Sequence, residues 1–282
     1  MMPYIWKDAF GIGWIDIHSY GAMAVVALLM ANWLIGRESR RVGYDVDRMF
    51  NLTILMFLVG LVGARLLHIA VYWDQFRDAP FGKVFRLWEG GLVWYGGVLA
   101  AAPFAMWYIG RNRKGLALWG AIDILYIGCV FGLAFARWGC LFAGCCYGQP
   151  CDLPWAVTYT HPDSVVVGAL GEGNATNLHP TPIYASIMSF AIVAILLWVQ
   201  RRKRFDGQIF ALGLVLYAIG RYGLEFVRGD MKRGFVEFWD GFSVSTSQLI
   251  GIGTVAFAVL LWVVLGRRQA RQVAADAEAA EK

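Results

Sequence analysis

Arginines within apolar segments are the first feature of the chain that could do chemistry. Arg221, Glu225 and Arg228 are spaced i, i+4 and i+7, so in a helix they share one face. Arg65 and Arg137 also lie in or at the end of apolar segments. One glutamate cannot neutralise all of these arginines. Guanidinium groups suit phosphate, because each can donate two parallel hydrogen bonds to it. The residues therefore predict a phosphate site, with a simple Arg221–Glu225 ion pair that hides both charges as the alternative.

The composition predicts the elements that must hold these arginines. The chain has 282 residues, of which 59% are hydrophobic and 16% are charged, and its mean hydropathy is +0.53. Water-soluble domains carry about 25% charged residues, so an ordinary soluble domain, a coiled coil and a disordered chain are excluded. We predict an all-α polytopic membrane protein, because a span needs about 20 apolar residues. Its seven helices are expected at 18–36, 51–72, 88–109, 116–136, 183–199, 209–228 and 248–265.

Positive charge predicts the orientation of these helices. Lys and Arg are concentrated in the segments after the first, third and fifth helices and in the C-terminal tail. The positive-inside rule then places the N-terminus outside and the C-terminus in the cytoplasm. The expected organisation is an external segment at 1–17, a membrane domain at 18–265 with an outer head region at about 137–182, and a cytoplasmic tail at 266–282.

This topology brings polar side chains to a common depth. Arg65, Tyr95 and Arg221 would each lie about 10 Å below the outer interface, at 1.5 Å per residue. Arg137 would close the fourth helix on the same side. A phosphate group at that depth is most simply a phospholipid headgroup that has entered a cavity from the outer leaflet. No basic stripe alternates with soluble recognition elements, so nucleic acid is not expected as a partner.

Seven short motifs, in order along the chain, resemble one known family. They are HSYG at 18–21, GAR at 63–65, WEGGLVWYGG at 88–97, RWGCLFAGCCYG at 137–148, LHPTPIY at 178–184, GRYGLEFVRGD at 220–230 and STSQ at 245–248. The ordered set resembles the bacterial prolipoprotein diacylglyceryl transferases. The resemblance implies transfer of the diacylglyceryl group of phosphatidylglycerol to the lipobox cysteine thiol of a lipoprotein precursor. A thioether forms and glycerol phosphate is released, in the bacterial cytoplasmic (inner) membrane, without a cofactor.

The resemblance also implies roles for particular residues. Arg137 and Arg221 would bind the phosphate, Glu225 would hold Arg221 in position, and Tyr95 would belong to the catalytic group. The residues expected to bind or shape the substrate pocket are Tyr20, Arg65, Gly96, Gly97, Gly148, His179 and Arg228. Two alternatives stay open from the residues themselves. Arg65 could instead be buried against helix carbonyls, and paired glycines in helices often serve close packing.

This chain differs from the family pattern at several positions. Tyr95 stands where the family commonly has a histidine that is thought to act as the base. The base could then be His179, His68 or Glu225. Alternatively, no side-chain base is needed if the arginines lower the pKa of the substrate thiol.

Cysteines replace polar residues of the family's loop motif. Cys140 and Cys145 stand at positions that are usually Asn and Glu, and Cys146 and Cys151 follow. An extracytoplasmic loop with four cysteines predicts one or two disulfides. A zinc site is an alternative, but the spacing is not a familiar ligand pattern and no metal is expected for the reaction. These cysteines also leave two other functions open: a membrane thiol oxidoreductase or metal-handling protein, or a non-catalytic paralogue that binds phospholipid or lipoproteins.

Overall fold

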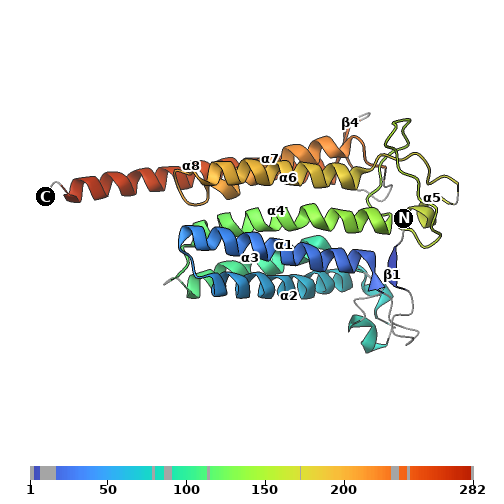
Figure 1. The fold of residues 1–282 in the computed structure, drawn as a ribbon, viewed down its shortest axis with the longest axis horizontal. Coiled ribbons are helices and arrows are strands. Elements are labelled where there is room, and N and C mark those ends of the chain that lie inside the picture. Colours follow the sequence, from blue (N-terminus) through green and yellow to red (C-terminus); the bar gives the residue numbers. More distant parts are fainter. Residues whose placement is uncertain are drawn as a thin grey trace. The chain divides into compact units, whose positions relative to one another are not determined.

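Seven long helices make up most of the computed structural model, which describes residues 3–6, 17–77, 80–85, 91–112, 115–171, 173–229, 235–239 and 242–280. Each coincides with one of the seven predicted helices (Figure 1). The long helices are α1 (Ser19–Val42), α2 (Val46–Val71), α3 (Trp94–Arg111), α4 (Leu118–Ala143), α6 (Thr181–Gln200), α7 (Gln208–Glu225) and α8 (Thr246–Ala280).

The remaining elements are short. They are α5 (Val165–Leu170) and the 3-10 turns η2 (Trp73–Gln75) and η3 (Phe81–Phe85). Strand β1 (Tyr4–Trp6) pairs antiparallel with β2 (Ile17–His18), and β3 (Phe235–Trp239) with β4 (Phe242–Ser245). The protein is all-helical in its long elements, as predicted, and these two short strand pairs are additions that the sequence did not predict.

Five of the helices are long and apolar enough to cross a membrane. They are α1, α2, α4, α6 and α8. Helices of this length and hydropathy satisfy their backbone hydrogen bonds internally, as a bilayer requires. The chain is therefore a polytopic membrane protein.

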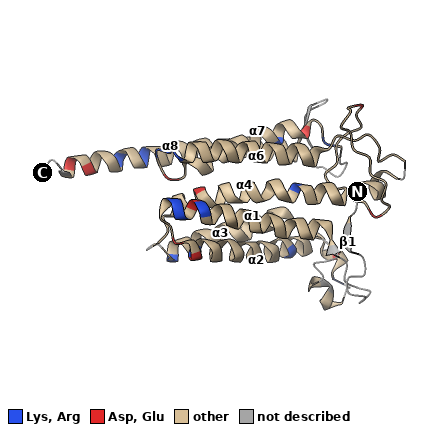
Figure 2. Cartoon of the chain, viewed as in Figure 1, with Lys and Arg blue, Asp and Glu red and all other residues tan. Residues whose placement is uncertain are grey.

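Several helices extend beyond their predicted bounds, and the extensions of α4 and α8 are the longest. Helix α4 continues to Ala143, so Arg137 and Cys140 lie in its last turns rather than in the outer loop. No glycine with a positive φ interrupts it before Gly144, whose φ is 71°. Helix α8 continues through the Ala-rich tail, and its charged residues are confined to its C-terminal part (Figure 2). Most of the predicted external segment at 1–17 lies outside the described residues.

The chain forms two compact units. Ile35–Leu125 makes one of them, and Met1–Leu34 with Tyr126–Lys282 makes the other. In the unit of Ile35–Leu125, α2 and α3 cross closely at glycines. A Cβ added to Gly63 would lie 2.5 Å from the carbonyl oxygen of Gly96. Buried apolar side chains such as Met49, Leu52 and Ile109 form the core of this unit.

The second unit, Met1–Leu34 with Tyr126–Lys282, contains the bundle of α4, α6, α7 and α8. Its core joins Ile127 of α4, Leu196 of α6 and Ile209 of α7. The buried Ser186 Oγ donates a 2.8 Å hydrogen bond to the carbonyl of Ala134, which ties α6 to α4. A separate apolar cluster that includes Tyr147 lies in the region after α4. We call residues 144–180 the head.

Candidate active site

Three arginines line one pocket of the second unit. Arg137 comes from α4, Arg221 from α7, and Arg228 from the segment that follows α7. The cavity that these side chains enclose is small, about 10 Å³. The other lining residues are Cys146, Thr181, Pro182, Ala185, Met188, Ser189, Tyr217 and Leu224. The structure thus brings together Arg137 and Arg221, which the sequence assigned to the phosphate, and Arg228, which it assigned to the substrate pocket.

Helix α7 holds Arg221 by two contacts. Its Nη1 lies 2.6 Å from Oε2 of Glu225, one turn later, and its Nη2 donates to Ser247 Oγ at 3.1 Å, near the start of α8. The Glu225 side chain is only 4% exposed, whereas that of Arg221 is 20% exposed. A buried carboxylate and a hydroxyl therefore fix the guanidinium while part of it still faces the pocket. The predicted ion pair is present, and its geometry suits a positioning role for Glu225.

Arg137 has an unused donor in the same pocket. Its Nε is buried and makes no hydrogen bond to any described residue. Tyr217 lies close enough to Arg137 for a side-chain hydrogen bond. A buried charged donor without a partner is costly, so this geometry is typical of a site that receives an acceptor from a ligand. The sequence prediction missed Tyr217, although its position four residues before Arg221 places it on the same helix face.

A backbone junction places Arg228 beside the end of α4. Gly148 N donates to the carbonyl of His179 at 3.1 Å, and Gly229 N donates to the carbonyl of Tyr147, also at 3.1 Å. A Cβ on Gly148 would lie 2.6 Å from the His179 carbonyl oxygen and would overlap its Cβ. A glycine is therefore needed at position 148 so that the two backbone segments can approach closely. This is a packing role, whereas the sequence predicted a role in substrate binding.

Two other predicted residues lie near the pocket without lining it. His179 Nδ1 is 3.3 Å from the hydroxyl of Tyr184, which also accepts a 2.8 Å hydrogen bond from Trp155 Nε1. Tyr20 lies in the first turn of α1, is 49% exposed and would contact a Cβ added to Gly139. Their predicted roles in substrate binding stay predictions.

The remaining predicted site residues belong to the unit of Ile35–Leu125. Arg65 donates from Nε to the Val84 carbonyl at 2.9 Å and from Nη1 to the Gly91 carbonyl at 3.1 Å. Backbone carbonyls thus bind Arg65, as in the alternative, but they belong to the 3-10 turn η3 and to the segment before α3 and not to a long helix.

Gly96 and Gly97 pack against α2, which favours the packing interpretation of this pair. Tyr95, in the first turn of α3, is half exposed. The assignment of Tyr95, Gly96, Gly97 and Arg65 to a substrate pocket stays a prediction.

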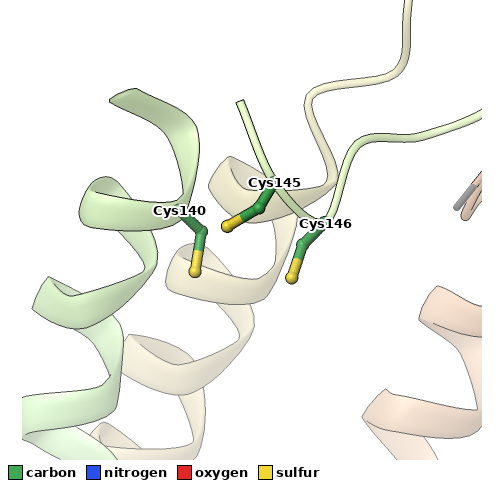
Figure 3. A group of neighbouring side chains, drawn as sticks. All are labelled: Cys140, Cys145 and Cys146. Carbon is green, nitrogen blue, oxygen red and sulfur yellow. The ribbon is translucent and has the colours of Figure 1, made fainter. Parts of the chain in front are cut away.

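Three thiols gather at the end of α4. The Sγ atoms of Cys140, Cys145 and Cys146 all lie within 4.8 Å of one another (Figure 3). All five cysteines of the chain are free thiols, so the expected disulfides are not formed in this structure. Cys151 is not part of the cluster.

The electrostatics of the cluster favour one thiolate. Hydrogen bonds from the thiols of Cys140 and Cys145 lower the pKa of Cys146, and the positive charges of Arg228 and Arg137 lower it further. The pKa of Cys145 is raised, chiefly because its thiol hydrogen-bonds to Cys140. Cys146 also lines the arginine pocket, so the two sites share a wall.

The fold defines a multi-pass membrane protein, and the charge of its arginine pocket suits an anionic group. Comparison with known proteins makes the assignment specific. The chain belongs to the prolipoprotein diacylglyceryl transferase family, whose model matches residues 7–264.

Several bacterial phosphatidylglycerol–prolipoprotein diacylglyceryl transferases are similar to the chain. That of Clostridium tetani is 32% identical over 93% of this chain and 97% of its own length. Transferase 2 of Clostridium perfringens is 30% identical over 93% and 94%, and that of Symbiobacterium thermophilum is 33% identical over 82% and 84%. The chain is a transferase, and its substrates are phosphatidylglycerol and prolipoproteins.

Proposed function

We propose that the chain moves the diacylglyceryl group of phosphatidylglycerol onto the lipobox cysteine of a lipoprotein precursor, with the three pocket arginines stabilising the phosphate that leaves. The reaction takes place at the outer face of the bacterial cytoplasmic membrane. All seven long helices cross this membrane, with the N-terminus outside and the C-terminus in the cytoplasm.

The reaction is a substitution at the glyceryl C3 carbon. The sulfur of the acceptor cysteine forms a bond to C3 while the bond from C3 to the phosphate oxygen breaks and its electron pair stays on that oxygen. The thiol proton is lost, and the phosphodiester becomes a monoester with one additional negative charge. Donors that are already oriented toward that charge lower the barrier, because they need no reorganisation as it develops.

The unused donor of Arg137 is the observation that carries this assignment. Its buried Nε has no acceptor among the described residues, and it lies in the pocket that Arg221 and Arg228 also line. A phosphate group has enough oxygen acceptors to satisfy several guanidinium donors at once. Glu225 supports the same arrangement, because it holds Arg221 without lining the pocket.

The pocket favours a reaction without a dedicated side-chain base. Its described lining contains no histidine, aspartate or glutamate, and the Cys146 sulfur in it is engaged by hydrogen bonds with Cys140 and Cys145. Glu225 is engaged with Arg221, and His179 lies within hydrogen-bonding distance of Tyr184. Nearby positive charge favours the ionised form of a thiol. We therefore assign activation of the acceptor cysteine to the field of the arginines, and its proton passes to water.

Reconstitution tests the proposed function directly. The purified chain is placed in phosphatidylglycerol vesicles with a lipobox peptide, and mass spectrometry measures the diacylglyceryl thioether. Phosphatidylethanolamine vesicles and a peptide with serine in place of the lipobox cysteine are the controls. We expect product only with phosphatidylglycerol and the cysteine peptide. Folded protein that binds phosphatidylglycerol but forms no thioether would instead identify a non-catalytic paralogue.

A further inference from the structure

The three-thiol cluster has no role in the proposed reaction, and the backbone at the end of α4 brings its members together. Helix α4 ends in a Schellman motif: Cys145 N donates to the Cys140 carbonyl, and Gly144 N donates to the Leu141 carbonyl. Gly144 has a φ of 71°, the left-handed conformation that this motif requires. In this motif the residue after the left-handed glycine contacts the residue five positions before it. Here these two residues are Cys145 and Cys140, so their thiols lie close together.

The third thiol is held by a second conformation that is unusual for its residue type. Cys146 has a φ of 57°, which side chains other than Gly, Asn and Asp seldom adopt. The Thr181 hydroxyl at the start of α6 donates to the carbonyl of Cys146 and fixes its peptide. These two left-handed conformations of the backbone thus direct the side chains of Cys145 and Cys146 to the same side as that of Cys140 (Figure 3).

The cluster has the chemistry of a soft-metal site. Zinc binds thiolates at about 2.3 Å, which places sulfurs in a tetrahedral site about 3.8 Å apart. The three Sγ atoms already lie within 4.8 Å of one another, so modest side-chain rotation is enough to close the site. Three thiolates and one Zn²⁺ leave one net negative charge. Arg228 and Arg137 lie within electrostatic range of Cys146 and compensate it.

Two buried hydroxyls next to the cluster have no hydrogen-bond partner among the described residues. Tyr159, which is 4% exposed, and Ser164, which is 1% exposed, both pack over Gly144. Tyr159 is within electrostatic range of all three cysteines. A phenol there can donate to a metal-bound thiolate or to a water in the fourth position, which is the kind of supporting hydrogen bond that metal sites use.

We propose that Cys140, Cys145 and Cys146 bind one Zn²⁺ ion, which joins the end of α4 to the head of the protein. The site is distinct from the reacting atoms, but Cys146 is shared with the wall of the arginine pocket. Zinc therefore stabilises the turn that places this wall and takes no part in the substitution. The site takes the place of the disulfides expected from the sequence.

Metal analysis of the full chain tests this site. The protein is purified in detergent under reducing conditions, desalted and incubated with Zn²⁺ or Co²⁺ alone. We expect inductively coupled plasma mass spectrometry to find about one bound zinc per chain. With Co²⁺, we expect an absorption band from thiolate-to-cobalt charge transfer. Cys140→Ser, Cys145→Ser and Cys146→Ser should each weaken zinc binding more than about 100-fold, since each removes a direct ligand, whereas loss of a supporting group costs about 10- to 100-fold.

Cys151→Ser and Cys129→Ser are the matched controls, because both remove a cysteine outside the cluster, and both should keep the metal. Alkylation of the wild-type protein gives a second measurement that needs no variant: zinc should protect three thiols. The proposal is overturned if reduced, folded protein takes up neither metal, if zinc protects no thiol, or if the three cysteines are found in disulfides. These readouts do not depend on turnover, so they can fail while the transferase assay succeeds, and the reverse.

Discussion

At the residue scale, the three pocket arginines differ in how they are held. Arg221 is fixed by Glu225 and Ser247, whereas the Nε of Arg137 has no acceptor among the described residues. A donor that the protein leaves unused is free to strengthen its contact as charge develops on the substrate. Arg137 is therefore the arginine whose loss should affect turnover most directly.

Arg137→Ala should lower the rate constant of thioether formation by about 100- to 1,000-fold, or about 2.7–4 kcal/mol, the cost of losing one charge-stabilising donor. Initial rates with saturating phosphatidylglycerol and lipobox peptide measure this effect. Arg271→Ala is the control, because Arg271 is exposed in the C-terminal part of α8. Full turnover by folded Arg137→Ala would remove this arginine from the mechanism.

Glu225→Gln should also lower turnover, because the Arg221 guanidinium loses the charge that orients it. If Glu225 acts only through Arg221, the two substitutions are not additive, and the double variant with Arg221→Ala should be no slower than Arg221→Ala alone. A double-mutant cycle on the same initial rates measures the coupling. Additive losses, or a changed pH profile in Glu225→Gln, would indicate an independent role such as that of a base.

Tyr95→Phe tests the residue that replaces the family's usual histidine. If its hydroxyl donates to the phosphate, the substitution should raise the barrier by about 1.5–3 kcal/mol, the worth of a hydrogen bond to a charged group. Parallel measurement of kcat and KM separates an effect on the reaction from one on binding. Unchanged values for both would show that the hydroxyl has no part in the reaction.

Sequence spacing predicted some of these contacts and not others. The i, i+4 spacing of Arg221 and Glu225 predicted their ion pair, since helix geometry alone brings them together. Tyr217 could have been found in the same way. The thiol cluster could not be predicted from ligand spacing, because it depends on the left-handed conformations of Gly144 and Cys146.

At the element scale, the positions of the helices were more predictable than their ends. Apolar runs of about 20 residues predicted all seven long helices. The end of an apolar run, however, predicts where the chain leaves the lipid. The helix itself ends only where its backbone conformation changes. Helix α4 therefore runs on to Ala143 and α8 to Ala280. For α4 the difference matters, because the extra turns carry both Arg137 and Cys140.

Close packing of α2 on α3 gives a prediction about stability. A Cβ on Gly96 would overlap the carbonyl oxygen of Gly63 and lie 2.6 Å from Leu67 Cβ, whereas a Cβ on Gly110 in the same helix would meet nothing within 4 Å. Gly96→Ala should destabilise the protein by about 1–3 kcal/mol, the usual cost of overpacking. Gly110→Ala should be neutral or slightly stabilising, because Ala favours a helix. Thermal unfolding in detergent compares the two, and equal midpoints would contradict the packing argument.

At the scale of the whole molecule, the number of membrane crossings determines on which side the head and the C-terminus lie. Helices α3 and α7 have 18 residues each, which gives about 27 Å at 1.5 Å per residue, close to the thickness of the hydrocarbon core. If both cross the membrane together with the five longer helices, an odd number of crossings separates the two termini. With the N-terminus outside, as the positive charges predict, the head follows the fourth crossing and also lies outside.

This topology predicts that green fluorescent protein fused after Lys282 fluoresces, since it folds in the cytoplasm, and that alkaline phosphatase fused there is inactive. Arg267, Arg268 and Arg271 follow the apolar part of α8 and should hold this end inside. A cysteine introduced at the exposed Thr176 of the head should react with a membrane-impermeant maleimide in intact spheroplasts. With the N-terminus outside, phosphatase activity at the C-terminus would require an even number of crossings, so either α3 or α7 would not span the membrane. The side of the membrane on which the arginine pocket lies would then have to be determined anew.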